Sequence, residues 1–127
     1  MAYVYDDTNI FARILRGEIP NKTVYETEHT LAFADIAPKA PAHVLVIPKG
    51  PYVTYDHFCA AASAEEIVDF SRAVAEVVKL VGAEAHSGGK GFRAITNAGE
   101  HGVQEVPHFH LHILAGRNIG PMILSED

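Results

Sequence analysis

Three histidines alternate with apolar residues near the C-terminal end of the chain, where residues 108–113 read His-Phe-His-Leu-His-Ile. Because successive side chains of a β-strand point to opposite faces, a strand here places His108, His110 and His112 on one face and the apolar side chains on the other. An imidazole with a pKa near about 6.5 offers a neutral nitrogen at physiological pH. The pattern therefore predicts a strand that buries its apolar face and presents three histidines to a reacting group.

Two chemistries suit such a row of imidazoles. In nucleophilic catalysis the central His110 attacks phosphorus while His108 and His112 donate hydrogen bonds to phosphoryl oxygens or to the leaving group. In metal binding all nitrogens must lie about 2.0–2.1 Å from one ion, yet the first and third residues are separated by about 13 Å along a strand. The spacing favours catalysis at phosphorus without a metal or cofactor, and a metal protein is the alternative.

Further polar groups precede the histidines in the chain. Asn97, Gln104 and Glu105 could contact a phosphate or a leaving group, and Gly99 and Gly102 lie in the same segment. Glycine lets backbone N–H groups approach a phosphate closely. The segment is thus a candidate phosphate-binding loop.

Composition limits the possible partners and compartments. The 127 residues predict a single domain over residues 1–127, and the net charge of −6 with ten scattered Lys and Arg disfavours nucleic-acid polymers and anionic membranes. Cys59 is the only cysteine, which excludes an internal disulfide or a cysteine-based zinc cluster. The N-terminal residues do not resemble a secretory signal, and no apolar run approaches the about 20 residues of a membrane span. We expect a cytoplasmic protein.

The elements that position the histidines belong to an α+β fold. Helices are predicted over 9–15, capped by Thr8 or Asn9, and over 64–81, where Ser63 and Glu66 form a capping-box pattern. Strands are predicted over 23–26, 31–35, 43–48, 92–96 and 108–115. Since most connections are too short for parallel crossovers, we expect a five-stranded antiparallel sheet with one long and one short helix.

The longer helix carries an unusually wide apolar surface. Its apolar side chains span roughly 240° of the circumference, whereas about 100° suffices for a helix that packs on one sheet. The excess predicts a second buried contact with a partner subunit. The residues of this arc are Ile67, Phe70, Ala73, Val74, Ala75, Val77, Val78, Leu80 and Val81.

The segment 108–114 resembles the His-x-His-x-His-x-x signature of the histidine triad (HIT) superfamily. Five further segments resemble its Hint-type branch of purine nucleoside phosphoramidase-like proteins, so that the resemblance, to a bacterial-looking member, covers residues 9–124. These segments are 9–20, 32–38, 40–49, 96–100 and 116–121. The resemblance implies a HIT-like fold and a homodimer that pairs through the long helix and neighbouring strands.

Roles in the reaction follow from the same resemblance. His110 matches the nucleophile that forms a nucleotidyl-histidine, and His112 matches a contact to the neighbouring phosphate. His108 matches the triad member whose backbone carbonyl fixes the nucleophile's tautomer, and His43 matches a fourth histidine near the triad. Asn97 and Gln104 match residues on the phosphate side. The purine and ribose pocket is matched by Ile10, Phe11, Ile14, Phe33, Asp35 and Ile36, with Asp35 facing the ribose hydroxyls.

Two positions depart from the pattern of animal Hint proteins. Glu105 stands where they carry Ser, and its carboxylate could pair with an ammonium leaving group. Val103 replaces a Gly, which changes the loop near the phosphate. The function implied is cleavage of purine nucleoside phosphoramidates to a nucleoside monophosphate and an amine. The alternatives are a dinucleoside polyphosphate hydrolase and a nucleotide- or partner-binding module with vestigial catalysis.

Overall fold

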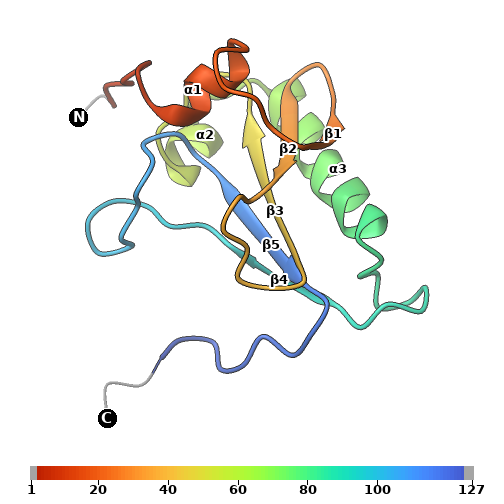
Figure 1. Cartoon of the computed structure of the whole chain (residues 1–127). Helices are drawn as coiled ribbons and strands as arrows, with labels where there is room; N and C mark the ends of the chain where they lie inside the picture. Colours follow the sequence, from red (N-terminus) through yellow and green to blue (C-terminus); the bar gives the residue numbers. More distant parts are fainter. Residues whose placement is uncertain (1–2, 125–127) are drawn as a thin grey trace.

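The computed structural model describes residues 3–124, which form three helices and five strands around one sheet (Figure 1). All neighbouring strands are antiparallel, in the order β1-β2-β3-β5-β4. This confirms the α+β class and the five-stranded antiparallel sheet. The elements are α1 (Ile10–Leu15), β1 (Thr23–Glu26), β2 (Thr30–Ala34), β3 (Ala42–Pro48), α2 (Tyr55–Ala61), α3 (Ala64–Leu80), β4 (Phe92–Ile95) and β5 (Leu111–Ala115).

The expectation of only two helices is wrong, because α2 forms between β3 and α3. Its N-cap is Thr54, whose side chain accepts a hydrogen bond from the backbone N–H of His57. The helix has seven residues and buries only Phe58. Such a short segment shows no apolar repeat of two turns, so the pattern of the sequence does not reveal it.

Strand β5 begins at Leu111, three residues later than expected. The backbone N–H of His108 donates to Val106 and that of Phe109 donates to Tyr52, so both are used outside the sheet ladder. The alternation of side chains nevertheless continues through this stretch. Phe109 and Ile113 lie in the apolar core with exposed fractions of 1% and 0%, and the histidines face the other side of the sheet.

Each face of the sheet is covered by a different layer. On one face the strands pack against α2 and α3 in a large core that includes Phe58, Phe70 and Phe109. On the other face Phe11 and Ile14 of α1 pack on β2 and β3, which also contribute Leu31, Phe33, Leu45 and Ile47. Because strands buried on both faces need apolar residues at every position, β3 is an almost continuous apolar run.

Both predicted helices begin at their predicted caps. The Asn9 side chain accepts from the N–H of Ala12 at the start of α1. At the start of α3, Ser63 and Glu66 each accept from the other's backbone N–H in a complete capping box. These caps satisfy N–H groups that a helix leaves without partners in its first turn, so they fix where each helix starts.

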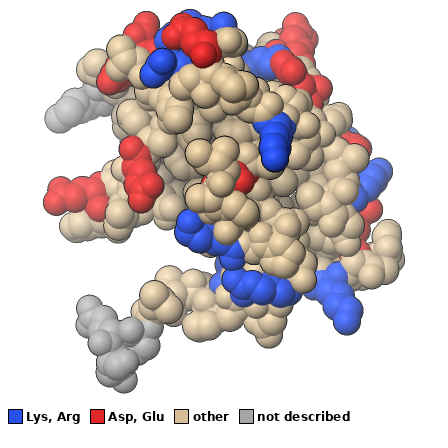
Figure 2. All heavy atoms as spheres, in the orientation of Figure 1, with Lys and Arg blue, Asp and Glu red and all other residues tan. Residues whose placement is uncertain are grey.

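Charged residues are spread over the surface. Figure 2 shows one face on which Lys and Arg lie beside acidic residues at the upper edge, while several Lys and Arg side chains adjoin one another in the lower part. None of the helices in residues 3–124 is both long and apolar enough to cross a membrane.

Candidate active site

A cavity of about 630 Å³ opens on the α1 face of the sheet, beside β3 and β5. Its wall contains three of the four predicted catalytic histidines, namely His43, His110 and His112. It also contains eight of the nine predicted nucleotide-binding residues: Ile10, Phe11, Ile14, Phe33, Asp35, Ile36, Asn97 and Glu105. His108 and Gln104 lie outside it.

A hydrogen bond to the backbone determines which ring nitrogen of His110 carries the proton. Its Nδ1 lies 2.8 Å from the backbone carbonyl oxygen of His108, and a carbonyl can only accept, so Nδ1 carries the proton. Nε2 of the neutral ring then carries an unshared electron pair. Burial lowers the pKa of His110, an effect opposed by the His108 carbonyl and by the negative charges of Asp35 and Glu105. His110 is therefore a neutral imidazole with a nucleophilic Nε2 at physiological pH.

His112 has the opposite tautomer because of a chain that begins on the loop between β2 and β3. The backbone N–H of Lys39 donates to Nδ1 of His43 at 3.0 Å, so His43 carries its proton on Nε2. That Nε2–H donates to Nδ1 of His112 at 2.9 Å. His112 consequently carries its own proton on Nε2. Burial and the neighbouring rings of His110 and His43 lower the pKa of His112 to about 4.

The sheet register brings these two rings together. Leu45 of β3 pairs with His112 of β5, and His43 pairs with Leu114, so His43 and His112 are diagonal neighbours on one face. Burial also lowers the pKa of His43, more than the nearby Asp35 raises it. Both rings are therefore neutral at physiological pH.

Asp35, His43 and His112 could also be considered as a metal site, since one ligand atom of each lies within 4.8 Å of the others. A metal-bound histidine normally donates its second ring N–H to an acceptor. In His43 the second nitrogen instead accepts the Lys39 N–H. The donor set thus does not fit a resident metal. His43 and His112 are joined by a hydrogen bond, and Oδ2 of Asp35 lies 3.4 Å from Nε2 of His43.

His108 supports the site from behind. Its ring is completely buried, and Nε2 lies 2.8 Å from the Pro48 carbonyl, so Nε2–H is the donor. Nδ1 then accepts from the hydroxyl of Tyr5 at 2.6 Å. Burial lowers the pKa of His108 to about 4. The two ring hydrogen bonds hold His108 in place, and with it the His108 backbone carbonyl that accepts from His110. Sequence reasoning missed Tyr5, because no spacing relates it to a residue so distant in the chain.

The side chain of Gln104 bonds to the backbone of its own loop and to that of the segment before α2. Its side-chain oxygen accepts from the N–H of Gly99, and its amide donates to the carbonyls of Val53 and Val106 at 2.7 and 2.9 Å. The neighbouring Val103 lines the cavity with a φ of 55°, a left-handed conformation that costs energy for a β-branched residue. In this structure Gln104 shapes the loop that carries Val103 and Glu105 to the cavity.

Apolar side chains form the other end of the cavity. Phe11 meets Phe33 edge to face, with ring centroids 5.6 Å apart, and it meets the ring of His110 in the same way at 5.0 Å. Ile10 and Ile36 stand at the mouth with exposed fractions of 43% and 96%. The cavity thus has one apolar end and one end lined by histidines, as is typical of sites for a ligand with an apolar and a polar part.

Known proteins match this chain over nearly its whole length. The sequence model of the HIT domain matches residues 16–119. The chain belongs to the HIT family. An uncharacterised HIT-like protein of Azospirillum brasilense is 57% identical over 123 residues, which cover 97% of this chain and 98% of that protein.

Two further HIT relatives carry functional names. The purine nucleoside phosphoramidase of Escherichia coli K12 is 38% identical over 120 residues, covering 94% of this chain and 97% of that enzyme. The structure of a HIT family hydrolase from Clostridium thermocellum superimposes with a TM-score of 0.81 at 35% identity, covering 94% of this chain and 99% of the other.

Proposed function

We propose that this HIT protein is a nucleotide hydrolase or transferase that cleaves purine nucleoside phosphoramidates to a nucleoside monophosphate and an amine. The observation that carries the proposal is that His110 and His112 are opposite tautomers. Their ring centroids lie 5.1 Å apart in one cavity. A nucleophile beside a hydrogen-bond donor suits displacement at phosphorus. The 38% identical phosphoramidase of E. coli supports this substrate class.

The reaction proceeds in two displacements at phosphorus. Nε2 of His110 bonds to phosphorus as the P–N bond to the amine breaks, and the amine leaves after taking a proton from solvent. Water then attacks phosphorus, the bond to Nε2 breaks, and the proton of the water returns to solvent. In both steps Nε2–H of His112 donates to a phosphoryl oxygen that gains negative charge. One water molecule is consumed, and no metal or cofactor takes part.

The remaining cavity residues bind the nucleoside and the departing group. Phe11, Ile14 and Phe33 receive the purine, and the carboxylate of Asp35 accepts hydrogen bonds from the ribose hydroxyls. Asn97 contacts the phosphate side. Glu105 lines the same cavity, and its negative charge raises the pKa of His110. Its carboxylate therefore favours a leaving group that departs as an ammonium ion.

The deciding experiment offers the protein a panel of adenosine and guanosine phosphoramidates and of dinucleoside polyphosphates, and measures release of nucleoside monophosphate. We expect turnover of the phosphoramidates that excess chelator leaves unchanged. Cleavage of the polyphosphates alone would support the first alternative, and nucleotide binding without turnover would support the binding module.

The variant His110→Ala tests the nucleophile within that experiment. We expect the rate to fall by at least about 10⁴-fold, because the covalent route is lost, while calorimetry still detects binding of AMP. His86→Ala is the matched control, since His86 is exposed in a loop away from the cavity. A near-normal rate in His110→Ala would exclude the covalent mechanism.

We further propose a cytoplasmic homodimer. The exposed thiol of Cys59 is suited to a reducing compartment, where it remains free. Apolar side chains stay exposed on α3 and β4 of the single chain, notably Val68 at 54%, Leu80 at 56% and Phe92 at 47%. Closed two-fold pairing is the commonest assembly of soluble proteins and would cover such a surface.

A further inference from the structure

The C-terminal end of β5 packs closely on the loop that precedes β3. Gly116, with a φ of +101°, lies so near Pro41 that an added Cβ would come within 2.8 Å of the proline Cβ. Only glycine tolerates both this contact and this backbone conformation. The end of the loop of residues 35–41 is therefore in close contact with Gly116.

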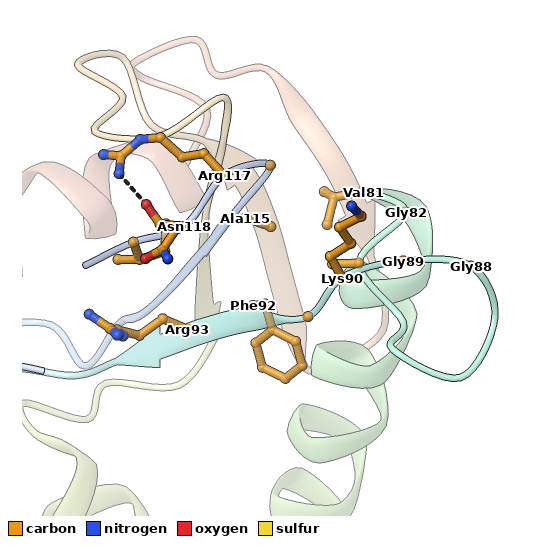
Figure 3. Close-up of a pocket in the computed structure, with 14 residues that line it drawn as sticks. Val81, Gly82, Gly88, Gly89, Lys90, Phe92, Arg93, Ala115, Arg117 and Asn118 are labelled. Carbon is orange, nitrogen blue, oxygen red and sulfur yellow. Dashed lines mark hydrogen bonds between the residues drawn. The ribbon is translucent and has the colours of Figure 1, made fainter. Parts of the chain in front are cut away.

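Arg117 adds a directed contact to the same loop. Its Nη2 donates to the backbone carbonyl of Lys39 at 2.8 Å, and its Nη1 donates to the carbonyl of Asn118 at the same distance. Figure 3 shows the Arg117 side chain extending away from Lys90, which lies at the other end of a second cavity. Of the cations that line this second cavity, Arg93 and Arg117 donate to backbone carbonyls.

Arg117 bonds to Lys39, and Lys39 determines the tautomer of His43. The carbonyl of Lys39 accepts from Arg117, and the N–H of Lys39 donates to Nδ1 of His43 at 3.0 Å. His43 in turn donates to His112 at 2.9 Å. Three consecutive hydrogen bonds thus connect an exposed guanidinium to the ring that faces the substrate phosphate, although Arg117 does not line the catalytic cavity.

We infer that Arg117 is a positioning residue: it fixes the Lys39 backbone so that His43, and through it His112, keeps the proton on Nε2. Without this contact the loop can turn the Lys39 N–H away from His43. His43 can then carry its proton on either nitrogen, and His112 loses the constraint that keeps its donor toward the phosphate. The kinetic consequence rests on the function proposed above, whereas the tautomers of the free protein do not.

The test measures tautomers by two-bond ¹H–¹⁵N correlation spectra of histidine-labelled protein at pH 7.5. The unmodified protein is expected to show Nε2–H for His43 and His112 and Nδ1–H for His110. Arg117→Met keeps the aliphatic stem but removes the donors, and we expect mixed tautomers at His43 and His112 only. An unchanged Nδ1–H signal of His110 shows in the same spectrum that the variant is folded, and Arg117→Ala provides a second reading.

Arg93→Met is the matched control. Arg93 also donates to two backbone carbonyls, those of Gly120 and Pro121, and neither bond reaches the loop of residues 35–41. Wild-type tautomers are expected in this variant. Wild-type tautomers at His43 and His112 in Arg117→Met would overturn the inference.

Kinetics with a nucleoside phosphoramidate give an independent reading. Arg117→Met should lower kcat about tenfold, as expected for losing one charge-assisted hydrogen bond to a positioned group, with KM within about twofold. Arg117→Lys retains a donor and should recover part of this loss, and Arg93→Met should retain the full rate. A rise in KM at constant kcat would contradict a positioning role. Absence of turnover in the unmodified protein would contradict the proposed function, and the spectra would still decide the role of Arg117.

Discussion

At the scale of single residues, hydrogen-bond partners give two neighbouring histidines opposite tautomers. His110 faces a carbonyl and must keep its proton on Nδ1, whereas His112 faces the Nε2–H of His43 and must keep its proton on Nε2. The alternating sequence predicts that these rings share a face, because that follows from strand geometry. It cannot predict the tautomers, since these depend on backbone groups of Lys39 and His108 whose directions only the fold determines.

Burial of the histidines predicts how stability depends on pH. The pKa of His108 and of His112 is about 4 in the folded protein, against about 6.5 in an unfolded chain. Between these values the unfolded state binds more protons, so the free energy of unfolding falls as the pH drops from about 6.5 to about 4. His108 alone contributes roughly 3 kcal/mol to this loss. Urea unfolding across this range measures it, and a constant midpoint between pH 6.5 and 4.5 would contradict it.

The contact of Tyr5 with His108 predicts a stability cost for a minimal change. Tyr5→Phe removes the hydroxyl that donates to Nδ1 and leaves a buried acceptor unsatisfied, so we expect a loss of about 1–2 kcal/mol. Tyr3→Phe is the matched control, because the Tyr3 hydroxyl bonds to Asp56 at the exposed surface and its removal should cost less than about 0.5 kcal/mol. Equal unfolding midpoints for the two variants would show that the Tyr5 hydroxyl stabilises the fold no more than the exposed Tyr3 hydroxyl does.

At the scale of elements, local signals decided which parts could be predicted. Asn9 and the capping box at Ser63 mark the starts of α1 and α3, and the continuous apolar run of β3 identifies a strand buried on both faces. The helix α2 has only a single capping side chain and one buried residue, so its formation depends on tertiary packing around Phe58. The cavity residues from α1, β2 and the loop after it come together only through sheet order, which the sequence does not encode locally.

The capping box of α3 predicts a second measurable effect. Ser63→Ala removes the acceptor for the N–H of Glu66 at the first turn of α3, and we expect a loss of about 1 kcal/mol in the free energy of unfolding. Ser71→Ala is the control, because Ser71 is exposed inside the same helix and alanine favours helix there. A loss in Ser71→Ala as large as that in Ser63→Ala would mean that capping is not the cause.

At the scale of the whole molecule, α3 leaves apolar side chains exposed, and two of them, Val68 and Ala75, share one flank. Asp69 bonds to Thr27 and Thr30 at the β1–β2 end, so this side of α3 faces β1 and β2. Val68 and Ala75 are seven residues apart and lie on the opposite flank, where both are exposed. The wide apolar arc thus divides into a part that packs on the sheet and a part that is available to a partner. Ala73 belongs to the first part, with 1% exposure, so it is no partner-facing position.

The homodimer can therefore be tested with one charge on that flank. Ala75→Glu would bury an unpaired carboxylate in the dimer, which costs on the order of 3 kcal/mol and should raise the dimer dissociation constant by more than about a hundredfold. In the separated chain the same side chain reaches water, so the fold should persist. Ala60→Glu introduces the same charge at an exposed alanine of α2 and should leave the dimer intact. Light scattering at micromolar concentration measures the mass of each protein. A monomer for the unmodified chain would refute the dimer, and a dimer for Ala75→Glu would place the interface elsewhere.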